Sequence, residues 1–550
     1  MSVRRHGGRV LALSMFVMGA CGLIYEYTLG VLGNHLVGTS HEQIFVVIGL
    51  MMFSMGVGSA LQRALHVDLI DRWLAIELVL GLAGGLSVIG IYAAFVYTAS
   101  YRLLMYGAAS LLGVLIGMEI PLLIRINQRY SSSLSANLSD VLFMDYAGSL
   151  AGAMLFAYVL LTRFTMFRIA LVLGMVNVGL AAIGIAYFWP LIRRRRLLST
   201  AAGASIVVLI AFMARADPLM ATFEQRCFRD PIVASETTEY QHLVVTRRDE
   251  RVHLYIDGNL QFSSVDERIY HEMLVHLPMI MARARQRVLI LGGGDGLALR
   301  EVLRYGDVEQ VVLVDIDPRM TELASTQADL VRLNEGAFHD ARVQALEAAG
   351  IGATGNTEIW REANEPFELG ERSQARLARV SVLNLDADLF LRNAAGLFDV
   401  VLIDFPDPTT VETAKLYSRG FYRNVVAHLA PGATVGVQST SPFHAREVFL
   451  CIGETLRAAG LRILRYHQNV PSFGEWGWHL AWLPGPDEKS MRERLGQIRH
   501  LPIETTYVTP ELLRASVVFG RDRLATGDIR PNTKMRPVIL DYHRRAWKSI

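Results

Sequence analysis

Seven runs of mostly apolar residues fill the first 215 positions of this 550-residue chain, and they restrict its fold more than any other feature. A helix needs about 20 mainly apolar residues to cross a bilayer, and the glycines and alanines in these runs suit close helix packing in lipid. The runs lie near residues 10–33, 43–62, 74–98, 103–125, 141–161, 167–190 and 197–214. The sequence therefore predicts an α-helical, multi-pass membrane domain of about seven spans over residues 1–215.

The composition of the chain excludes several other classes of protein. Of all residues, 52% are hydrophobic and 19% are charged, and the charged ones are concentrated after residue 215, where the sequence is typical of a soluble domain. A formal net charge of +2 argues against a nucleic-acid partner. Cys21, Cys227 and Cys451 are scattered, so neither a disulfide framework nor a metal site is predicted. The first apolar run is too long for a cleavable signal peptide.

A strand, a glycine-rich turn and a helix follow one another at residues 288–303. The turn consists of Gly292, Gly293, Gly294, Asp295 and Gly296. Glycines let the backbone approach a ligand closely, and the helix N-terminus behind them favours polar or anionic groups. On its own, such a turn is weak evidence, because any nucleoside-binding α/β domain has one.

Acidic residues follow the ends of the predicted strands. Asp315 follows the apolar run 311–314, and Asp404 follows the run 399–403. This alternation of strands and helices predicts a Rossmann-like, doubly wound α/β domain of the methyltransferase type. Because such sheets bind ligands outside the carboxyl ends of their strands, one group of acids is expected to converge: Asp295, Asp315, Asp386, Asp404 and Asp407.

Two further segments complete the expected architecture. Residues 231–262 form a small β-module with strand-like runs at 232–236, 242–247 and 252–256 and a hairpin turn at Asp257 and Gly258. The catalytic domain then covers residues 263–550, with a helix at 264–281 and an insertion at about 327–380. Helical patterns at 321–334 and 337–349 precede a polar, irregular stretch at 350–374, which is interpreted as a surface elaboration.

Five motifs occur in one order along residues 231–483, and they carry a specific resemblance. They are Tyr240-Gln241, the stretch 255–261, the helix with Tyr270 and His271, the glycine turn, and Asp404 with Asp407 and Pro408. This set resembles the spermidine synthase, or polyamine aminopropyltransferase, family. With the apolar half in front, the chain is similar to the membrane-bound branch of that family. A homo-oligomer is expected by analogy alone.

The resemblance implies transfer of an aminopropyl group from decarboxylated S-adenosylmethionine to putrescine or a related amine, with no permanently bound cofactor and no metal. An amine that is protonated at neutral pH must lose a proton before it attacks. Asp404 is the expected general base, assisted by Tyr270. Asp407 is expected to hold a second ammonium of the amine.

The remaining expected site residues bind the sulfonium cosubstrate. Asp315 would accept the ribose hydroxyls, although the family usually has glutamate there, and Asp386 with Ala387 would meet the adenine. A last group surrounds the aminopropyl end: Gln241, His271, Gly292, Gly293 and Asp295. Asp295 would repel the carboxylate of S-adenosylmethionine itself, which favours the decarboxylated form.

The chain departs from the family where the amine is expected to bind. Phe473 stands where a tyrosine is usual, and Ser439 to Ser441, with Thr440 between them, replace an expected acid. Glu475 is a hypothetical substitute for that lost charge. Trp476, Trp478 and Trp482 could form a cation–π wall, but a core stripe is favoured.

Two rival functions stay open. A methyltransferase shares the fold and the glycine turn, but the helix with Tyr270 and the pair Asp404 and Asp407 disfavour it. The other rival is a membrane polyamine carrier or sensor whose synthase-like domain does not turn over. The acids could also merely cap helices, as aspartates often do.

Charged residues in the apolar half raise two questions. The first concerns orientation, because arginines cluster on alternate loops: Arg4, Arg5, Arg9, Arg63, Arg72, Arg125, Arg129 and Arg193 to Arg196, against Arg102, Arg163 and Arg168. By the positive-inside rule the first group is cytoplasmic, so seven spans would put the catalytic domain outside. Because the implied substrates are made in the cytosol, a cytoplasmic catalytic domain and one miscounted or re-entrant span are favoured.

The second question concerns acids within the apolar runs. Glu26, Glu77, Glu119 and Asp145 are costly in lipid and suggest a polyamine or ion path. The favoured interpretation is structural, with Glu77 and Glu119 at helix ends and Glu26 paired with a neighbouring helix.

Overall fold

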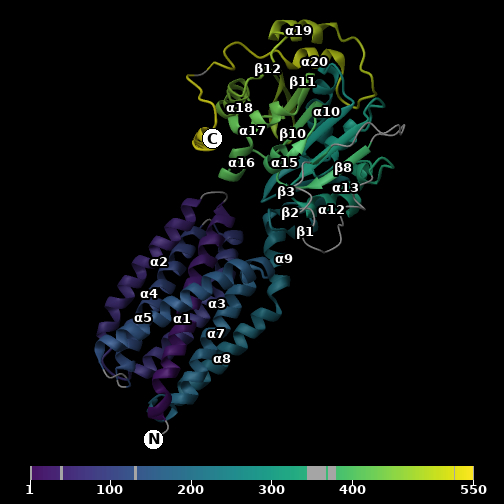
Figure 1. The fold of residues 1–550 in the computed structure, drawn as a ribbon. Coiled ribbons are helices and arrows are strands. Elements are labelled where there is room, and N and C mark those ends of the chain that lie inside the picture. The colour runs from purple at the N-terminus through teal and green to yellow at the C-terminus, as the bar shows by residue number, and fades with distance from the viewer. Residues whose placement is uncertain are drawn as a thin grey trace. The chain divides into compact units, whose positions relative to one another are not determined.

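The computed structural model describes residues 3–37, 41–98, 100–128, 130, 133–343, 367–368, 379–525 and 527–548. It divides into a helical unit, Met1–Arg229, and a mixed α/β unit, Asp230–Ile550 (Figure 1). Each unit has its own hydrophobic core. They are described separately below.

The helical unit contains long helices joined by short connections. Its elements are α1 (Val3–Val37), α2 (His41–Leu61), η1 (Gln62–Ala64), α3 (Leu69–Tyr97), α4 (Tyr101–Asn127), α5 (Leu134–Leu155), η2 (Phe156–Leu160), α6 (Leu161–Arg163), α7 (Met166–Phe188), η3 (Trp189–Leu191), α8 (Arg195–Ala214) and α9 (Ala216–Cys227). Seven helical stretches are long and apolar enough to cross a membrane, one for each predicted run.

Apolar side chains cover the outside of this unit as well as its core. Phe45, Phe53, Phe143 and Tyr158 are each about 70% exposed, whereas Trp73 and Phe188 are fully buried. A helix that is apolar on every side fits an apolar solvent rather than water. Composition and exposure therefore agree with helices built for lipid.

Glycine permits close helix contact where α5 crosses α1. A Cβ at Gly148 would overlap the carbonyl oxygen of Phe16, and one at Gly152 would lie 2.7 Å from that of Ala20. The close helix packing predicted for the glycines of the apolar runs is thus observed here as backbone contact.

Two acids meet inside the helical unit, which corrects the expectation that they sit at helix ends. Glu77 lies eight residues after the start of α3 and Glu119 eight residues before the end of α4, so each is about 12 Å from a helix terminus. Their exposed fractions are 0% and 2%. The indole N–H of Trp73 donates to Glu77 over 3.1 Å.

The β-module is a four-stranded antiparallel sheet in which each strand pairs with the next. Its strands are β1 (Ile232–Thr237), β2 (His242–Arg248), β3 (Arg251–Ile256) and β4 (Asn259–Ser263). The predicted turn at Asp257 and Gly258 joins β3 to β4, and both residues take positive φ. The fourth strand, after this turn, was not among the three predicted runs.

The second sheet is the doubly wound one. Its order is β12-β13-β11-β10-β5-β6-β8, in which β13 (Gly474–Trp482) runs antiparallel to both of its neighbours, β11 and β12 (Arg462–Val470). The parallel strands are β5 (Arg287–Gly292), β6 (Gln310–Asp315), β8 (Arg379–Asn384), β10 (Phe398–Asp404) and β11 (Leu429–Gln438). A separate pair consists of β7 (Phe367–Glu368) and β9 (Ala394–Ala395).

Helices cover both faces of this sheet (Figure 1). Val288 and Ile290 of β5 face the core with α10 (Glu267–Met281), α11 (Leu297–Val302), α12 (Pro318–Thr326), α13 (Ala328–Leu333) and η4 (Ala337–His339). Leu289 and Leu291 face the opposite core with α15 (Ala387–Asn393), α16 (Val411–Leu416), α17 (Arg419–Ala427), α18 (Arg446–Ala458) and α21 (Val538–Lys548). Alternate residues of one buried strand thus serve two cores, which explains its continuous apolar run.

The C-terminal segment packs on the edge of the unit. It includes α19 (Glu488–Gln497) and α20 (Pro510–Ser516), which cover β12 and α10. The Glu272 carboxylate accepts backbone N–H groups of Thr506, Tyr507 and Val508 at 2.7–2.9 Å. The helix predicted at 321–334 is divided into α12 and α13, and of the predicted insertion α13 and η4 are described, whereas the irregular stretch 350–374 lies almost entirely outside the described residues.

Candidate active site

Tyr270 and Asp404 form the central contact of the candidate site. Asp404 is the last residue of β10, and Tyr270 lies on the first turns of α10. The Tyr270 hydroxyl donates to Asp404 Oδ1 over 2.6 Å. This is a short bond to a carboxylate, of the strong, charge-assisted kind. The expected general base and the expected assisting tyrosine are therefore in direct contact.

The glycine turn approaches Asp404 from the neighbouring strand. Gly292 pairs with Asp404 in the parallel register of β5 and β10. Its φ is +83°, and a Cβ there would overlap the Asp404 carbonyl oxygen. Gly293 also takes positive φ, and a Cβ there would lie 3.6 Å from Asp404 Oδ2. Only glycine satisfies both the conformation and the space at position 292.

Asp315 and Asp295 hold the two ends of the same turn. The Asp315 carboxylate, at the end of β6, accepts the backbone N–H of Gly294 at 2.9 Å and that of Asp317 at 3.0 Å. Burial raises the pKa of Asp315 to about 6. The Asp295 carboxylate accepts the N–H of Leu297, and burial raises its pKa as well. Asp315 does not cap a helix, because Asp317 caps α12.

The expected adenine and aminopropyl contacts lie on either side of these acids. Asp386 caps α15 and also pairs with Lys415 Nζ at 2.7 Å, and these contacts lower its pKa although burial opposes them. Ala387 begins α15 and is nearly buried. Gln241, in the connection between β1 and β2, donates to Asp317 over 2.9 Å. The capping interpretation thus holds for Asp386 but not for Asp404.

Asp407 has a polar cradle of its own. Gln438 Nε2 lies 3.0 Å from Asp407 Oδ1, and the Thr440 hydroxyl donates to Oδ2 over 3.1 Å. Thr440 has φ of +59°, which is rare for a β-branched residue and marks local strain. Its backbone N–H is held by Gln438 Oε1 at 2.7 Å. The strained backbone at Thr440 therefore places its hydroxyl within hydrogen-bonding distance of Asp407.

His271 supplies the positive charge among these acids. Burial favours its neutral form, but Glu267 and the nearby charge of Asp295 raise the pKa of His271 to about 9. Burial raises the pKa of Asp404 to about 6, while the charge of His271 acts in the opposite direction. An imidazolium and an ionised Asp404 therefore coexist over a range around neutral pH.

One predicted amine ligand lies elsewhere. The Glu475 carboxylate pairs with His467 at 3.1 Å and Arg523 at 3.0 Å. Side chains alternate along β13, so Trp476 and Trp478 share the face that packs on Tyr270 and Phe473, while Glu475 points away from it. Trp478 and Trp482 are buried in the core, as favoured from the sequence.

Several residues of the site escaped sequence reasoning. Lys415 at Asp386 and Tyr417, which donates to the carbonyls of Phe405 and Pro406, follow the Asp407 loop without any motif. His543, on α21, lies close enough to Asp407 for their charges to interact. No local signal marks it, because it is more than 130 residues away along the chain.

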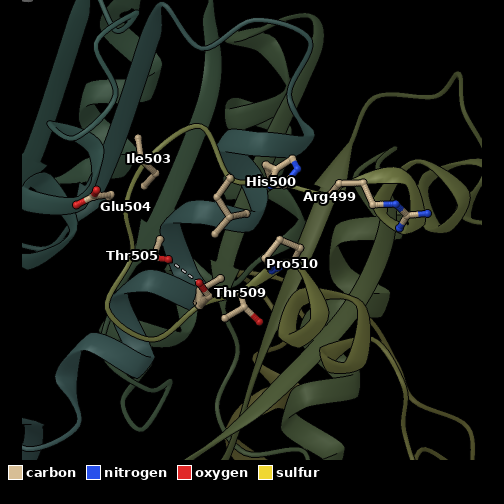
Figure 2. A pocket seen from close by; sticks show the side chains of 9 residues that line it. Arg499, His500, Ile503, Glu504, Thr505, Thr509 and Pro510 are labelled. Atoms are coloured by element: carbon tan, nitrogen blue, oxygen red, sulfur yellow. Dashed lines mark hydrogen bonds between the residues drawn. The ribbon is translucent and has the colours of Figure 1, made fainter.

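A separate pocket of about 410 Å³ lies on the C-terminal segment, lined by Arg499, His500, Leu501, Ile503, Glu504, Thr505, Val508, Thr509 and Pro510 (Figure 2). None of these residues belongs to the predicted site. Glu272, His276 and Glu301 also come close enough to hold a metal ion. However, the Glu272 carboxylate accepts three backbone N–H groups and Glu301 pairs with Arg300 and Arg304, so both acids already have partners within the protein.

Strand-end carboxylates, a glycine turn and a buried tyrosine thus lie in a Rossmann-type α/β domain. Comparison with known proteins identifies its family. Residues 267–358 and 370–490 match the family described as "Spermine/spermidine synthase domain". The chain belongs to this family, whose domain is the Rossmann-type α/β fold seen here.

Relatives match over nearly the full length, including the helical unit. Polyamine aminopropyltransferase 2 of Ralstonia nicotianae is 40% identical over 550 residues, covering 99% of each chain. Polyamine aminopropyltransferase 1 of Streptomyces coelicolor is 39% identical, covering 98% of this chain and 95% of the relative. The polyamine aminopropyltransferase of Mycobacterium tuberculosis is 34% identical, covering 98% and 96%.

We predict that Gly292→Ala destabilises the α/β unit, because the new methyl group would overlap Asp404 and the positive φ would strain the backbone. A loss of about 1–3 kcal/mol is expected, measured as a lower denaturation midpoint. Gly306→Ala is the matched control, since a Cβ there meets nothing within 4 Å. Equal midpoints for the two variants would contradict the prediction.

Proposed function

We propose that this protein transfers the aminopropyl group of decarboxylated S-adenosylmethionine to putrescine or a closely related amine, releasing methylthioadenosine. The single observation that carries the proposal is the 2.6 Å bond between Tyr270 and Asp404 at the strand ends. Membership of the spermine/spermidine synthase family, with relatives named polyamine aminopropyltransferases, supports it.

The reaction needs little beyond positioning and one proton acceptor. The amine nitrogen attacks the aminopropyl carbon, the carbon–sulfur bond breaks, and its electrons go to the sulfur as the neutral thioether leaves. The attacking amine must give up a proton, which Asp404 accepts. Tyr270 holds one oxygen of Asp404 and fixes the direction of the other, so the base is oriented before the amine binds.

Binding roles follow from the same geometry. Asp315, which accepts a backbone N–H of the glycine turn, is suited to the ribose hydroxyls. Its side chain is one methylene shorter than that of the glutamate usual in the family, so it reaches less far toward the sugar. Asp295, whose charge interacts with His271, is suited to the aminopropyl ammonium. Asp407, with acceptor oxygens steadied by Gln438 and Thr440, is suited to the far ammonium of the amine. The adenine end falls to Asp386 and Ala387.

We predict that Asp404→Asn reduces transfer by about 10²- to 10⁴-fold, because the amide accepts no proton. Purified full-length protein is given decarboxylated S-adenosylmethionine and a panel of amines, and products are identified by mass spectrometry. Asp399→Asn is a control, since Asp399 binds a backbone N–H of Arg287 at the opposite end of the strand. Methyl transfer, or no product from the unsubstituted protein, would overturn the proposed function.

The pKa of Asp404 also predicts a pH dependence. The carboxylate must be ionised to accept the proton, and its pKa is raised to about 6. As pH falls through that value, kcat/KM should decrease, approaching about tenfold per pH unit. A pH–rate profile from 5 to 9 checks this, and a profile that stays flat down to pH 4.5 would contradict it.

We propose that the helical unit crosses a membrane, which its seven long apolar helices and their exposed apolar side chains support. An odd number of crossings puts the two ends of the unit on opposite sides. The arginine-rich loops indicate a cytoplasmic N-terminus, so the seven-helix count favours the outer face for the α/β unit. This differs from the cytoplasmic placement favoured from the sequence. Oligomerisation remains a proposal by analogy.

We predict that reporters at the two chain ends give opposite answers. Green fluorescent protein fused before residue 1 should fluoresce, as expected in the cytoplasm, and alkaline phosphatase fused after residue 550 should be active, as expected outside. The swapped pair of fusions is the control. Both ends reporting the cytoplasm would mean that one of the seven helices does not cross.

A further inference from the structure

Behind the carboxylates lies a row of buried charges that the proposed reaction does not use directly. Glu267 and His271 stand four residues apart on α10, and Arg300 lies on α11. Their exposed fractions are 2%, 2% and 3%. Buried charges of this kind are costly unless each is paired, so their arrangement calls for an explanation.

The His271 ring has a fixed orientation. Its Nδ1 lies 2.8 Å from the carbonyl oxygen of Glu267 and 3.1 Å from the Glu267 carboxylate. Both partners are acceptors, so Nδ1 carries a hydrogen and donates it. The ring also packs edge-on against Tyr270, with centroids 4.9 Å apart. The charge on this ring acts on Asp295 and Asp404.

Glu267 is itself clamped. Two guanidinium nitrogens of Arg300 donate to its two oxygens, over 2.8 and 2.9 Å. Arg300 is anchored in turn by the carbonyl oxygen of Leu333 at 2.6 Å and by Glu301 at 2.7 Å. This two-point contact holds Glu267 ionised and immobile, so it can serve as a fixed counter-charge for His271.

We propose that Glu267 and Arg300 are positioning residues, which hold His271 as an imidazolium whose charge keeps Asp404 and Asp295 ionised. The proposal rests on the proposed aminopropyl transfer. No proton leaves the pair during the reaction, because the proton of the attacking amine goes to Asp404. A purely structural alternative is that the pair only fastens α10 to α11.

The first test compares Glu267→Gln with Glu301→Gln. Glu301 is the matched control, because it is also buried and bonded to Arg300 but contacts His276 rather than His271. In Glu267→Gln, His271 loses its anionic partner and becomes neutral at lower pH, so Asp404 loses a stabilising charge and its pKa rises. The acid limb of kcat/KM should move up by about one pH unit, a loss of about fivefold at pH 6 that approaches about tenfold at lower pH.

In Glu301→Gln the acid limb should stay in place, whatever happens to the denaturation midpoint. Equal shifts in both variants, or no shift in Glu267→Gln, would overturn the proposal. The double variant Glu267→Gln with His271→Gln should behave as His271→Gln alone, because Glu267 acts through the histidine. Additive losses would support the structural alternative.

A second measurement does not depend on catalysis. The His271 resonance of the ¹³C-histidine-labelled full-length protein is assigned by its disappearance in His271→Gln and followed with pH. It should remain that of an imidazolium through neutral pH and titrate near pH 9. Titration at the ordinary value of about 6.5 would overturn the proposal even if Glu267→Gln fails to fold. If the titration is as expected but the protein transfers no aminopropyl group, the proposed function alone fails.

Discussion

The cost of keeping buried carboxylates ionised is the constraint on which the candidate site depends. Parallel strands bring Asp404, Asp315 and the acids around them to one edge of the sheet, and burial there raises the pKa of each of these two to about 6. Acids that took up protons would no longer act as a base or as ammonium ligands. The charge of His271 and hydrogen bonds from backbone N–H groups and Tyr270 stabilise the ionised forms of these acids.

The sheet and the positions of its acids could be predicted because both follow from local patterns. A buried parallel strand is apolar on both faces, so β5 and β10 appear as continuous apolar runs, and the residues after them must lie at the ligand-binding edge. Gly292 is recognisable for the same reason, since a turn that approaches a neighbouring strand excludes any side chain. Each of these predictions depends only on the local sequence and needs no knowledge of which distant residues come into contact.

Other contacts could not be predicted because they depend on long-range geometry. Glu475 was assigned to the amine site from its place in the sequence. Because side chains alternate between the two faces of β13, Glu475 points away from Tyr270 and pairs with Arg523 instead. Glu77 and Glu119 were assigned to helix ends. However, α3 begins eight residues before Glu77, and α4 ends eight residues after Glu119. His543 approaches Asp407 only because α21 folds back across the unit. Each of these depends on an element boundary or a tertiary pairing that no motif encodes.

Three consecutive residues of α10 have three unrelated tasks. Tyr270 contacts Asp404, the proposed base, His271 is the proposed imidazolium, and Glu272 anchors the C-terminal segment through Thr506 to Val508. The helix cannot turn or slide by one residue without disturbing all of them. A new acceptor amine would therefore be acquired through substitutions in other elements, such as the loop with Thr440 that contacts Asp407. Substitutions that change the amine specificity are therefore expected in the elements around α10 rather than in α10 itself.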